Sequence, residues 1–445
     1  MTRSFPPTHV LFGIQASSSS ERRQWALGFG HSLGLGTWSL VIPLLFLLIG
    51  AAHSQAWLDL VDDSLFVESK NGVARLDLSG RLDLEGYYID QRPPGLIFTD
   101  DKFFFNPRLV LFVDARLGKH LYSFVQARFD RGFDPGLDPD GDARFDEYLL
   151  RYTPFDDSRL NLQVGKFATV VGNFGLRHQS WDNPFINAPL PYENVVAMTD
   201  QSVPAGPAGL LGRRAVADKK DLWVPLLWGP GYTTGASLFG TLGRFDYAFE
   251  LKNASISSRP ATWDARSSEI GWDAPTIGAR LGYRPAAAWN LGVSVSEGAY
   301  LLPVAEKTAA FPAGKDRGDY LQSTFAADAR YEWRRLQLWA EVFASRFEVP
   351  NVGDADTLAW YLEAKYKLTS SLFIATRWNQ QFFGKVDDGL GGERRWDDDL
   401  WRIDTALGWR FTRHLQAKVQ YSYTHEHGNL QQGEQLVAVQ TTLRF

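Results

Sequence analysis

The chain of 445 residues contains no cysteine and only two methionines. Without cysteine there are no disulfides, no thiolate metal sites and no cysteine nucleophiles. Charge of one sign is also missing as a long run: 22% of residues are charged and the formal net charge is −5. A balanced, mildly acidic chain of this kind gives no reason to expect a nucleic-acid partner.

Short motifs of common enzyme and metal chemistry are absent as well. There is no Gly-x-Ser-x-Gly element, and the glycine-rich stretch 387–393 lacks the lysine and hydroxyl of a phosphate-binding loop. The aspartates of 137–147 begin like a calcium loop, but Ala143 and Leu149 occupy positions where an EF-hand needs Gly and Glu. We therefore predict no enzyme activity, no cofactor and no metal site.

Long apolar runs are confined to the N-terminal region. The stretch TWSLVIPLLFLLIGAA (37–52) has the length of a signal-peptide core, with two arginines upstream and small residues after it. Cleavage after Ala56 fits the small-x-small rule and cleavage after Ala52 is the close alternative, while an N-terminal anchor helix is the competing interpretation. We predict that 1–56 are an N-terminal extension with a signal peptide and that 57–445 are exported.

What the chain does contain, from about residue 73 onward, is hydrophobic alternation with a period of two. In 360–368, Trp360, Leu362 and Tyr366 alternate with Glu363 and Lys365. Alternation of this kind indicates strands with one apolar and one polar face. In this and similar segments the apolar face carries Trp, Tyr or Phe near at least one end.

Sixteen such segments can be counted, and an even number suits an antiparallel barrel. An eleven-residue strand at ~3.3 Å per residue, tilted about 40°, rises ~28 Å, which is enough for the apolar band of an outer membrane. The expected strands are 73–88, 103–117, 121–131, 143–154, 159–171, 231–241, 244–254, 276–285, 288–298, 319–332, 335–347, 357–367, 371–383, 400–411, 414–425 and 435–445.

The connections between these segments alternate strictly between short and long. A transmembrane β-barrel with short periplasmic turns and long external loops has this pattern. Lipid cannot satisfy an open sheet edge, so the sheet has to close, and a C-terminal aromatic such as Phe445 is typical of outer-membrane barrels. The sequence therefore predicts an all-β, antiparallel transmembrane barrel of about 16 strands, with its first strand near 73 and its last at 435–445.

One connection, 172–230, is far longer than the others and joins the fifth and sixth strands. Its prolines fix the backbone and remove donors, so it cannot become another strand. We expect this third loop to fold into the lumen as a constriction, with Trp181, Phe185 and Tyr192 on the barrel wall. The alternative is an external loop packed across the barrel mouth or against a neighbouring subunit.

The stretch QVGKFATVVGNFGLR (163–177) resembles the fifth-strand Gly-Lys-Phe…Phe-Gly-Leu signature of the porin O/P family, the phosphate-selective porins and their relatives of Gram-negative outer membranes. The resemblance is local in residues but extends to the predicted strand number. It implies a third loop inside the lumen, and the strand number of general porins implies a homotrimer. The family's phosphate-binding members carry a run of lumenal arginines and lysines, whereas loop 172–230 has five basic and five acidic residues.

Charged residues on the expected inward faces are candidates for lining a pore. Arg116 and Arg128 lie near the short turn joining the second and third strands, where two approaching guanidinium groups would attract anions. The alternative is that interior charges pair with each other and hold the wall in shape. The candidate lining or selectivity residues are Arg108, Arg116, Arg128, Arg151, Arg177, Asp182, Arg213, Arg214, Lys252 and Arg280.

These features predict an outer-membrane porin through which small hydrophilic solutes or ions diffuse passively, with anions such as phosphate as the finer expectation. Its expected partners are outer-membrane lipid, lipopolysaccharide, further copies of the chain and the solutes themselves. The competing hypothesis is a structural or adhesive surface barrel with a plugged lumen, whose external loops bind partners.

Overall fold

A computed structural model describes residues 64–89, 102–131, 141–213, 222–259, 272–428 and 433–445, all within one compact unit that runs from residue 48 to 445. The predicted signal peptide and its cleavage site lie outside the described residues. Among the helices of the described ranges, none is long and apolar enough to cross a membrane.

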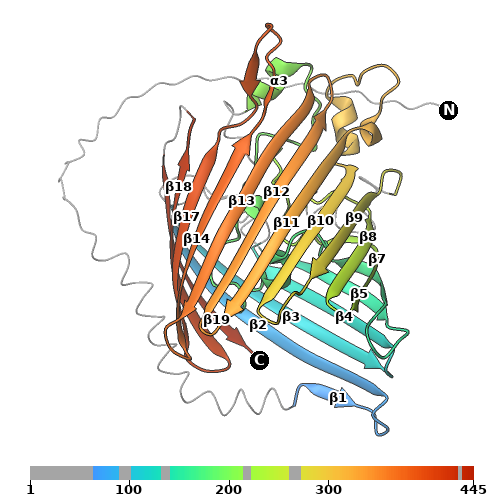
Figure 1. Cartoon of the computed structure of the whole chain (residues 1–445), viewed down its shortest axis with the longest axis vertical. Coiled ribbons are helices and arrows are strands. Elements are labelled where there is room, and N and C mark those ends of the chain that lie inside the picture. Colours follow the sequence, from blue (N-terminus) through green and yellow to red (C-terminus); the bar gives the residue numbers. More distant parts are fainter. Residues whose placement is uncertain (1–63, 90–101, 132–140, 214–221, 260–271, 429–432) are drawn as a thin grey trace, which may run out of the picture. The chain divides into compact units, whose positions relative to one another are not determined.

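The described chain forms one antiparallel sheet that closes on itself (Figure 1). Each strand pairs with the next strand of the ring, and the last strand pairs with the first, with Val437 opposite Tyr88. The ring consists of sixteen strands, namely β2 (Ala74–Ile89), β3 (Phe103–Leu117), β4 (Leu121–Asp130), β5 (Asp142–Tyr152), β6 (Asn161–Phe167), β7 (Thr233–Leu242), β8 (Phe245–Lys252), β9 (Thr276–Tyr283), β10 (Trp289–Ala299), β11 (Leu321–Trp333), β12 (Leu336–Val349), β13 (Gly353–Lys367), β14 (Leu372–Phe383), β17 (Leu400–Arg410), β18 (Leu415–Glu426) and β19 (Glu434–Arg444).

The predicted fold class is confirmed, and each predicted strand overlaps one strand of the ring. Three short strands were not predicted: β1 (Phe66–Glu68), which pairs with the start of β2, and the hairpin of β15 (Lys385–Asp387) and β16 (Glu393–Arg395). Each has only three residues, too few to show a period of two.

The two faces of the sheet differ as the alternation predicts. Along β13, Leu358, Leu362 and Tyr366 are 42%, 52% and 45% exposed, whereas Tyr361 and Glu363 between them are 1% and 0% exposed. The exposed face is therefore apolar and the buried face points into the ring. An apolar outer band over a polar interior is the arrangement of a barrel that stands in lipid.

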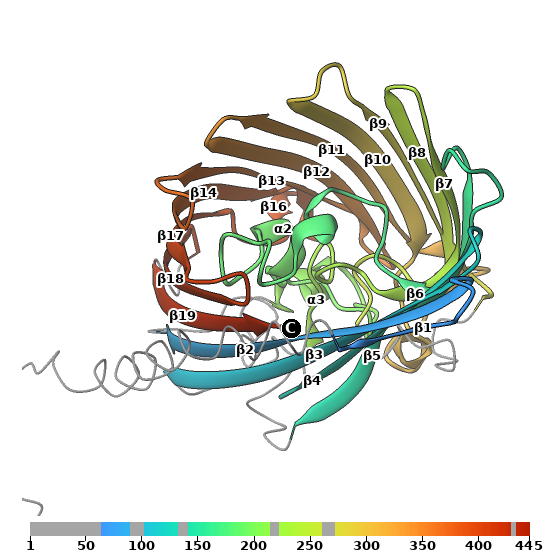
Figure 2. The same cartoon turned by 90° about the horizontal axis from the view of Figure 1, so that it is seen from below.

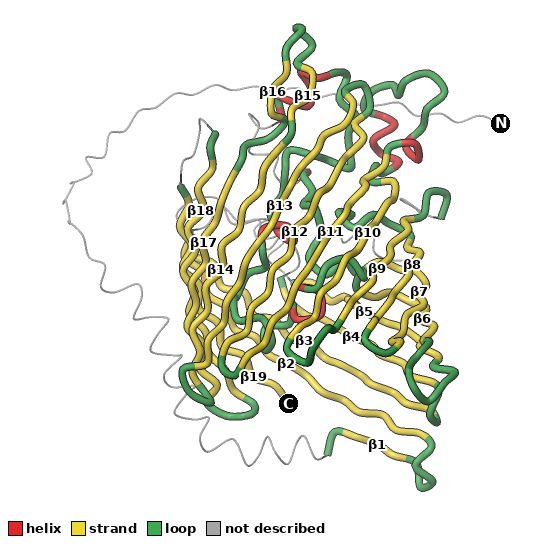
Figure 3. Tube along the Cα trace, in the orientation of Figure 1, coloured by secondary structure: helices red, strands yellow, loops and turns green. Residues whose placement is uncertain are grey.

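The two ends of the barrel carry different connections (Figure 3). At the short-turn end neighbouring strands are joined by tight turns, such as the one at Gly243, whose φ of 63° suits glycine. Arg334 takes a similar φ of 54° in the turn between β11 and β12. The long-loop end holds the β15–β16 hairpin and two short 3-10 helices, η5 (Pro303–Lys307) and η6 (Arg317–Asp319).

The seam of the barrel lies at the C-terminus. Gly80 and Phe445 exchange backbone hydrogen bonds of 2.8 and 3.0 Å. The aromatic ring of Phe445 rests on Gly80 so closely that a Cβ on this glycine would overlap it. The last residue thus completes the pairing of the last strand with the first, which leaves no open edge between them.

Candidate functional site

Most of the described part of the connection between β6 and β7, residues 168–213 and 222–232 and called the inner loop below, lies inside the ring of strands (Figure 2), while its last short helix, 207–211, lies at the long-loop end (Figure 1). It carries the 3-10 helix η1 (Phe174–Arg177) and two short α-helices, α2 (Leu190–Glu193) and α3 (Pro207–Leu211). Its residues bond to inward-facing side chains of β2, β8, β9, β12, β14, β17 and β18. The predicted inward folding of the third loop is confirmed.

A chain of buried ion pairs fixes the inner loop to the wall. Arg177 at the end of η1 pairs with Glu363 of β13 at 2.6 Å. At the other end, Glu193 of α2 pairs with Arg402 of β17 at 2.5 Å. Between them Arg377 bridges the strands, and its guanidinium also donates to the backbone oxygen of Ala188 at 3.0 Å.

Wall side chains also hold the loop backbone directly. The ammonium group of Lys418 donates to three loop carbonyls, those of Ser180, Asn183 and Phe185, at 2.8, 3.0 and 2.9 Å. A wall side chain can also act as the acceptor: the carboxylate of Glu341 in β12 accepts a hydrogen bond of 2.5 Å from the backbone N–H of Asn173. The loop therefore owes its position to strands that lie far from it in sequence.

On one side of the lumen, apolar packing also holds the inner loop against the wall. Val196, Leu226 and Leu227 of the inner loop are fully buried with Phe343 and Phe347 of β12 in one hydrophobic cluster. Tyr192 packs edge-on against Phe343 with ring centroids 5.5 Å apart. This side of the barrel interior is thus a dry core and not a water path.

The expected aromatic anchors lie against the wall in different ways. Phe185 is fully buried with two alanines of β14 and β17. Trp181 lies under the guanidinium of Arg444, 4.1 Å from the ring centroid, with that of Arg410 at 5.2 Å. Stacking of this type uses the negative face of the indole ring and adds to loop fixation.

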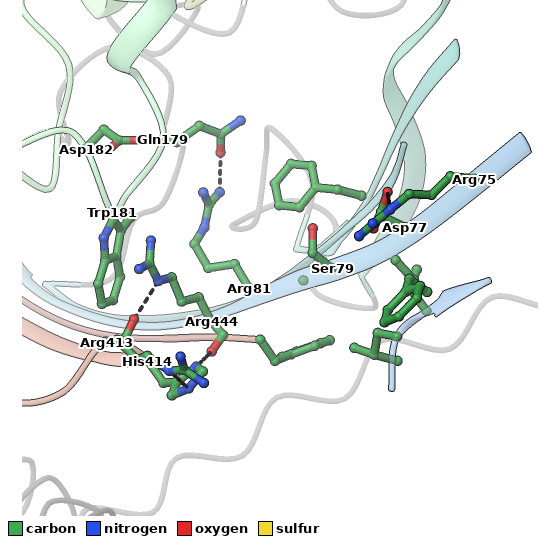
Figure 4. A pocket seen from close by; sticks show the side chains of 16 residues that line it. Arg75, Asp77, Ser79, Arg81, Gln179, Trp181, Asp182, Arg413, His414 and Arg444 are labelled. Atoms are coloured by element: carbon green, nitrogen blue, oxygen red, sulfur yellow. Dashed lines mark hydrogen bonds and ion pairs between the residues drawn. The ribbon is translucent and has the colours of Figure 1, made fainter. Parts of the chain in front are cut away.

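Space remains on the other side, between the inner loop and strands β2 to β5. A cavity of about 190 Å³, the lumen cavity, is lined there by inward-facing residues of those four strands and by the loop segments around 174–193 and 228–232. A second cavity of about 510 Å³ lies at the short-turn end, where Asp77, Arg413 and Arg444 are among its lining residues (Figure 4). Arg81 and Gln179, which bond to each other, line both cavities.

The wall of the lumen cavity is a lattice of alternating charges. Arg108 of β3 bonds to Asp83 and Glu85 of β2 at 3.1 and 2.5 Å. Arg128 of β4 lies 2.5 Å from Asp130, in the same strand. Further pairs join Arg81 to Asp83 at 3.1 Å and Arg144 to Asp130 and Asp146 at 2.8 and 3.1 Å. Each arginine in the lattice has a carboxylate partner, so the wall carries both signs in equal measure.

His178 of the inner loop faces this lattice. Its Nδ1 lies 2.5 Å from the carbonyl oxygen of Gly175 and its Nε2 lies 2.6 Å from the Tyr232 hydroxyl. These contacts suit a neutral ring that donates from Nδ1 and accepts at Nε2. Burial, together with the nearby positive charge of Arg81, lowers the pKa of His178 to about 4.

The ten predicted lining residues occupy quite different places. Arg108 and Arg128 line the lumen cavity, and Asp182 lines the cavity at the short-turn end. Arg177 is buried against Glu363, and Lys252 is buried with its ammonium group on the Phe167 and Thr233 carbonyls. Arg280 forms an ion pair with Asp328, and Arg151 and Arg213 donate hydrogen bonds to Gln163 and to the Ser202 carbonyl. Arg116 is exposed at the end of β3, and Arg214 lies outside the described residues.

The expected approach of Arg116 to Arg128 was wrong. In the β3–β4 register Arg116 lies opposite Tyr122 and Arg128 lies opposite Val110. Six strand residues at ~3.3 Å each therefore separate their positions, about 20 Å. Arg128 instead lies opposite Arg144, and the carboxylates of Asp130 and Asp146 lie beside both.

Several residues that build the site were not predicted. Arg81, Asp83 and Glu85 alternate with leucines in β2, so the period of two already places them on one face. Arg377 and Arg402 alternate with apolar residues in the same way. Their partners in the inner loop could not be inferred, because nothing in a single sequence tells which wall a long loop touches. In the described ranges no group of three or more possible metal ligands occurs.

No protein-family model and no curated protein sequence matches the chain. Solved structures do resemble it. OmpF of Salmonella typhi, in complex with daunomycin, superposes with a TM-score of 0.53 at 13% identity and covers 85% of this chain and 100% of its own. The outer membrane channel DcaP of Acinetobacter baumannii superposes with a TM-score of 0.53 at 12% identity and covers 85% of this chain and 99% of its own. The anion-selective porin from Comamonas acidovorans superposes with a TM-score of 0.51 at 10% identity and covers 84% of this chain and 100% of its own. The chain therefore has the fold of outer-membrane porins and channels.

Proposed function

We propose that the protein is an outer-membrane porin through which small hydrophilic solutes diffuse passively. The observation that carries the proposal is the polar, charge-lined lumen cavity, which a wall-anchored loop narrows inside a closed barrel with an apolar outer face. A hydrated polar passage replaces the hydration that a solute would lose in lipid, and the lining groups set which solutes enter. The mechanism is physical and involves no covalent step.

Membership of the porin O/P family and the homotrimeric state are further parts of the proposal. Support for the family comes from 163–177, which form the end of β6 and the start of the inner loop, as the resemblance implies. We also propose export through the N-terminal signal peptide and contact with lipid and lipopolysaccharide at the aromatic-edged apolar band.

The lumen cavity gives little support for selectivity toward anions such as phosphate. A selectivity filter for one sign of charge needs a ring of that sign. Here Arg81, Arg108 and Arg128 each have a carboxylate within ion-pair distance. We therefore propose weak selectivity between small anions and cations.

The experiment is single-channel recording of the refolded mature protein in a planar bilayer, followed by the reversal potential in a KCl gradient. Stable conductance steps with a reversal potential close to zero are expected. A strongly anion-selective potential, with block by phosphate, would restore the phosphate hypothesis.

A second function is favoured by one observation, the dry core of the inner loop against β12. If this core together with the external loops seals the barrel, the protein is a structural or adhesive surface barrel. Electrical silence from a barrel that is correctly folded, shown by heat-modifiable migration in detergent gels, would establish this alternative over the porin.

A further inference from the structure

Among the residues that the structure describes, the lining of the lumen cavity has no surplus of charge. Among its lining residues are three arginines, Arg81, Arg108 and Arg128, and three carboxylates, Glu85, Asp146 and Glu193. All six have a partner of opposite sign within 4.0 Å in the described structure. A solute that carries a single charge therefore finds no unpaired counter-charge here.

Neutral hydrogen-bonding groups dominate the rest of the polar lining. Five side-chain amides and three hydroxyls face the cavity, those of Asn106, Gln126, Gln179, Asn183, Asn187, Ser180, Tyr87 and Tyr232. An amide offers both donors and an acceptor, and a hydroxyl offers both roles on one atom. A solute with several hydroxyl groups matches this mixture, since each of its hydroxyls can also donate and accept.

One of these amides has an unused acceptor. Asn106 of β3 is only 8% exposed, and its Nδ2 donates to Glu85 at 3.4 Å. Its Oδ1 is buried and accepts no hydrogen bond in the described structure. An orphaned buried acceptor costs free energy. Because Asn106 lines the cavity, a small rotation of its amide would expose this oxygen to a solute hydroxyl, which would then satisfy it.

Aromatic rings complete the lining. Phe174, Trp228 and Tyr232 of the inner loop are among the residues that border the cavity. The negative face of an aromatic ring attracts weakly positive C–H groups, and the ring of a sugar presents such C–H groups on its faces.

The size of the cavity limits the solute. About 190 Å³ is room for about six waters at ~30 Å³ each, comparable to one monosaccharide ring and too little for a chain of several sugars. We propose that the lumen cavity is a binding subsite for a neutral, polyhydroxylated solute of monosaccharide size. The proposal rests on the diffusion pore proposed above and names the class of solute that this pore favours.

The test first records KCl conductance of the intact protein in planar bilayers, and then adds glucose, glucosamine or glucuronate. These three probes share the sugar ring and differ in charge, being neutral, cationic and anionic. Permeation is measured in parallel from the swelling of protein-containing liposomes. We expect glucose to raise current noise, to block the open channel reversibly, and to permeate at least as fast as either charged sugar.

Two variants separate binding at the cavity from passage through any pore. Asn106→Leu removes the unused acceptor and should weaken glucose block about fivefold, the loss expected for one hydrogen bond of about 1 kcal/mol. Asn290→Leu is the matched control, because Asn290 of β10 also has a buried, unpartnered Oδ1 but does not line the lumen cavity. It should leave glucose block unchanged.

The outcomes distinguish the two proposals. If no KCl steps occur, the pore itself is refuted. If the pore conducts and glucuronate, inorganic phosphate, glucosamine or zwitterionic glycine blocks or permeates better than glucose, the neutral-solute subsite is overturned while the porin stands. The subsite is equally overturned if all probes pass without block. The comparison of the three sugars in the unmodified protein remains decisive if Asn106→Leu fails to fold.

Discussion

Arg377 is one of the buried wall residues that hold the inner loop, and its replacement by methionine gives a quantitative test. The side chain is fully buried, with its guanidinium 2.8 Å from Asp404 and 3.4 Å from Glu363. It also bonds to the loop at the Asn187 Oδ1, 2.9 Å away. Breaking a buried ion pair by removal of one partner costs ~3–5 kcal/mol. In the Arg377→Met variant, Glu363 still pairs with Arg177 and Asp404 still pairs with Arg402. We therefore expect the free energy of unfolding to fall by about 3 kcal/mol, the lower end of that range.

The matched control is Arg346→Met. Arg346 also contacts two aspartates, Asp354 and Asp356 at 2.9 and 2.7 Å, but its side chain is 50% exposed on the outer face of the barrel. Exposed ion pairs contribute only ~0–1 kcal/mol. The same chemical change should therefore have a much smaller effect at this position.

Both variants are measured by urea unfolding of the refolded barrel in detergent micelles, with the free energy taken from the midpoint and slope. Single-channel recording of the same samples should show noisier and larger steps for Arg377→Met alone, since the loop at 187–188 loses a wall contact. Equal free-energy losses for the two variants would refute the view that this buried arginine anchors the loop. Unchanged conductance with the expected loss of stability would show that the loop does not narrow the passage.

Three further outcomes are expected. Lys418→Met orphans three loop carbonyls and should cost about 3 kcal/mol in the same urea assay, whereas Lys418→Arg should retain part of the contact. Gly80→Leu forces a side chain into the Phe445 ring and should cost ~1–3 kcal/mol, visible as a lower temperature for loss of the compact band on detergent gels; an unchanged band would show that the seam tolerates overpacking. Because the folded pKa of His178 is about 4 and its ordinary value about 6.5, the unfolded chain binds the proton first, so stability should be constant above pH 6.5 and fall between pH 6.5 and 4. In His178→Gln the loss of stability between pH 6.5 and 4 should be smaller. An equally steep loss in this variant would show that other groups cause it.

The barrel strands could be predicted because each carries its own local signal. A period of two is visible within ten residues, and the expected segment 103–117 coincides with β3. The predicted and observed strand ends differ where polar residues continue a strand beyond its apolar part. β13 begins at Gly353, four positions before the predicted start, because Asp354 and Asp356 lie on the outer face beyond the apolar band.

The site was less predictable because its contacts are not local. The inward orientation of Arg108 and Arg128 follows from alternation, but their partners depend on strand register and on a bulge between Gln126 and Ala127. That bulge shifts β5 by one residue and places Asp146 at the lattice. A single sequence contains the charges of both signs but does not show that they neutralise each other pair by pair.

The anchoring of the inner loop also determines the order in which the molecule can be completed. The partners of Arg177 and of the Ser180 carbonyl lie 186 and 238 residues further along the chain. Closing such distant contacts carries the entropy of a very large loop, and folds dominated by them form slowly. The loop also bonds to β2, β8 and β9, but without β12 to β18 it lacks the ion pairs of Arg177 and Glu193 and the aromatic residues of β12 that cover its apolar side chains. We therefore expect the loop to reach its final position only once β12 to β18 are in place, in the same late stage of folding as closure of the seam between β19 and β2.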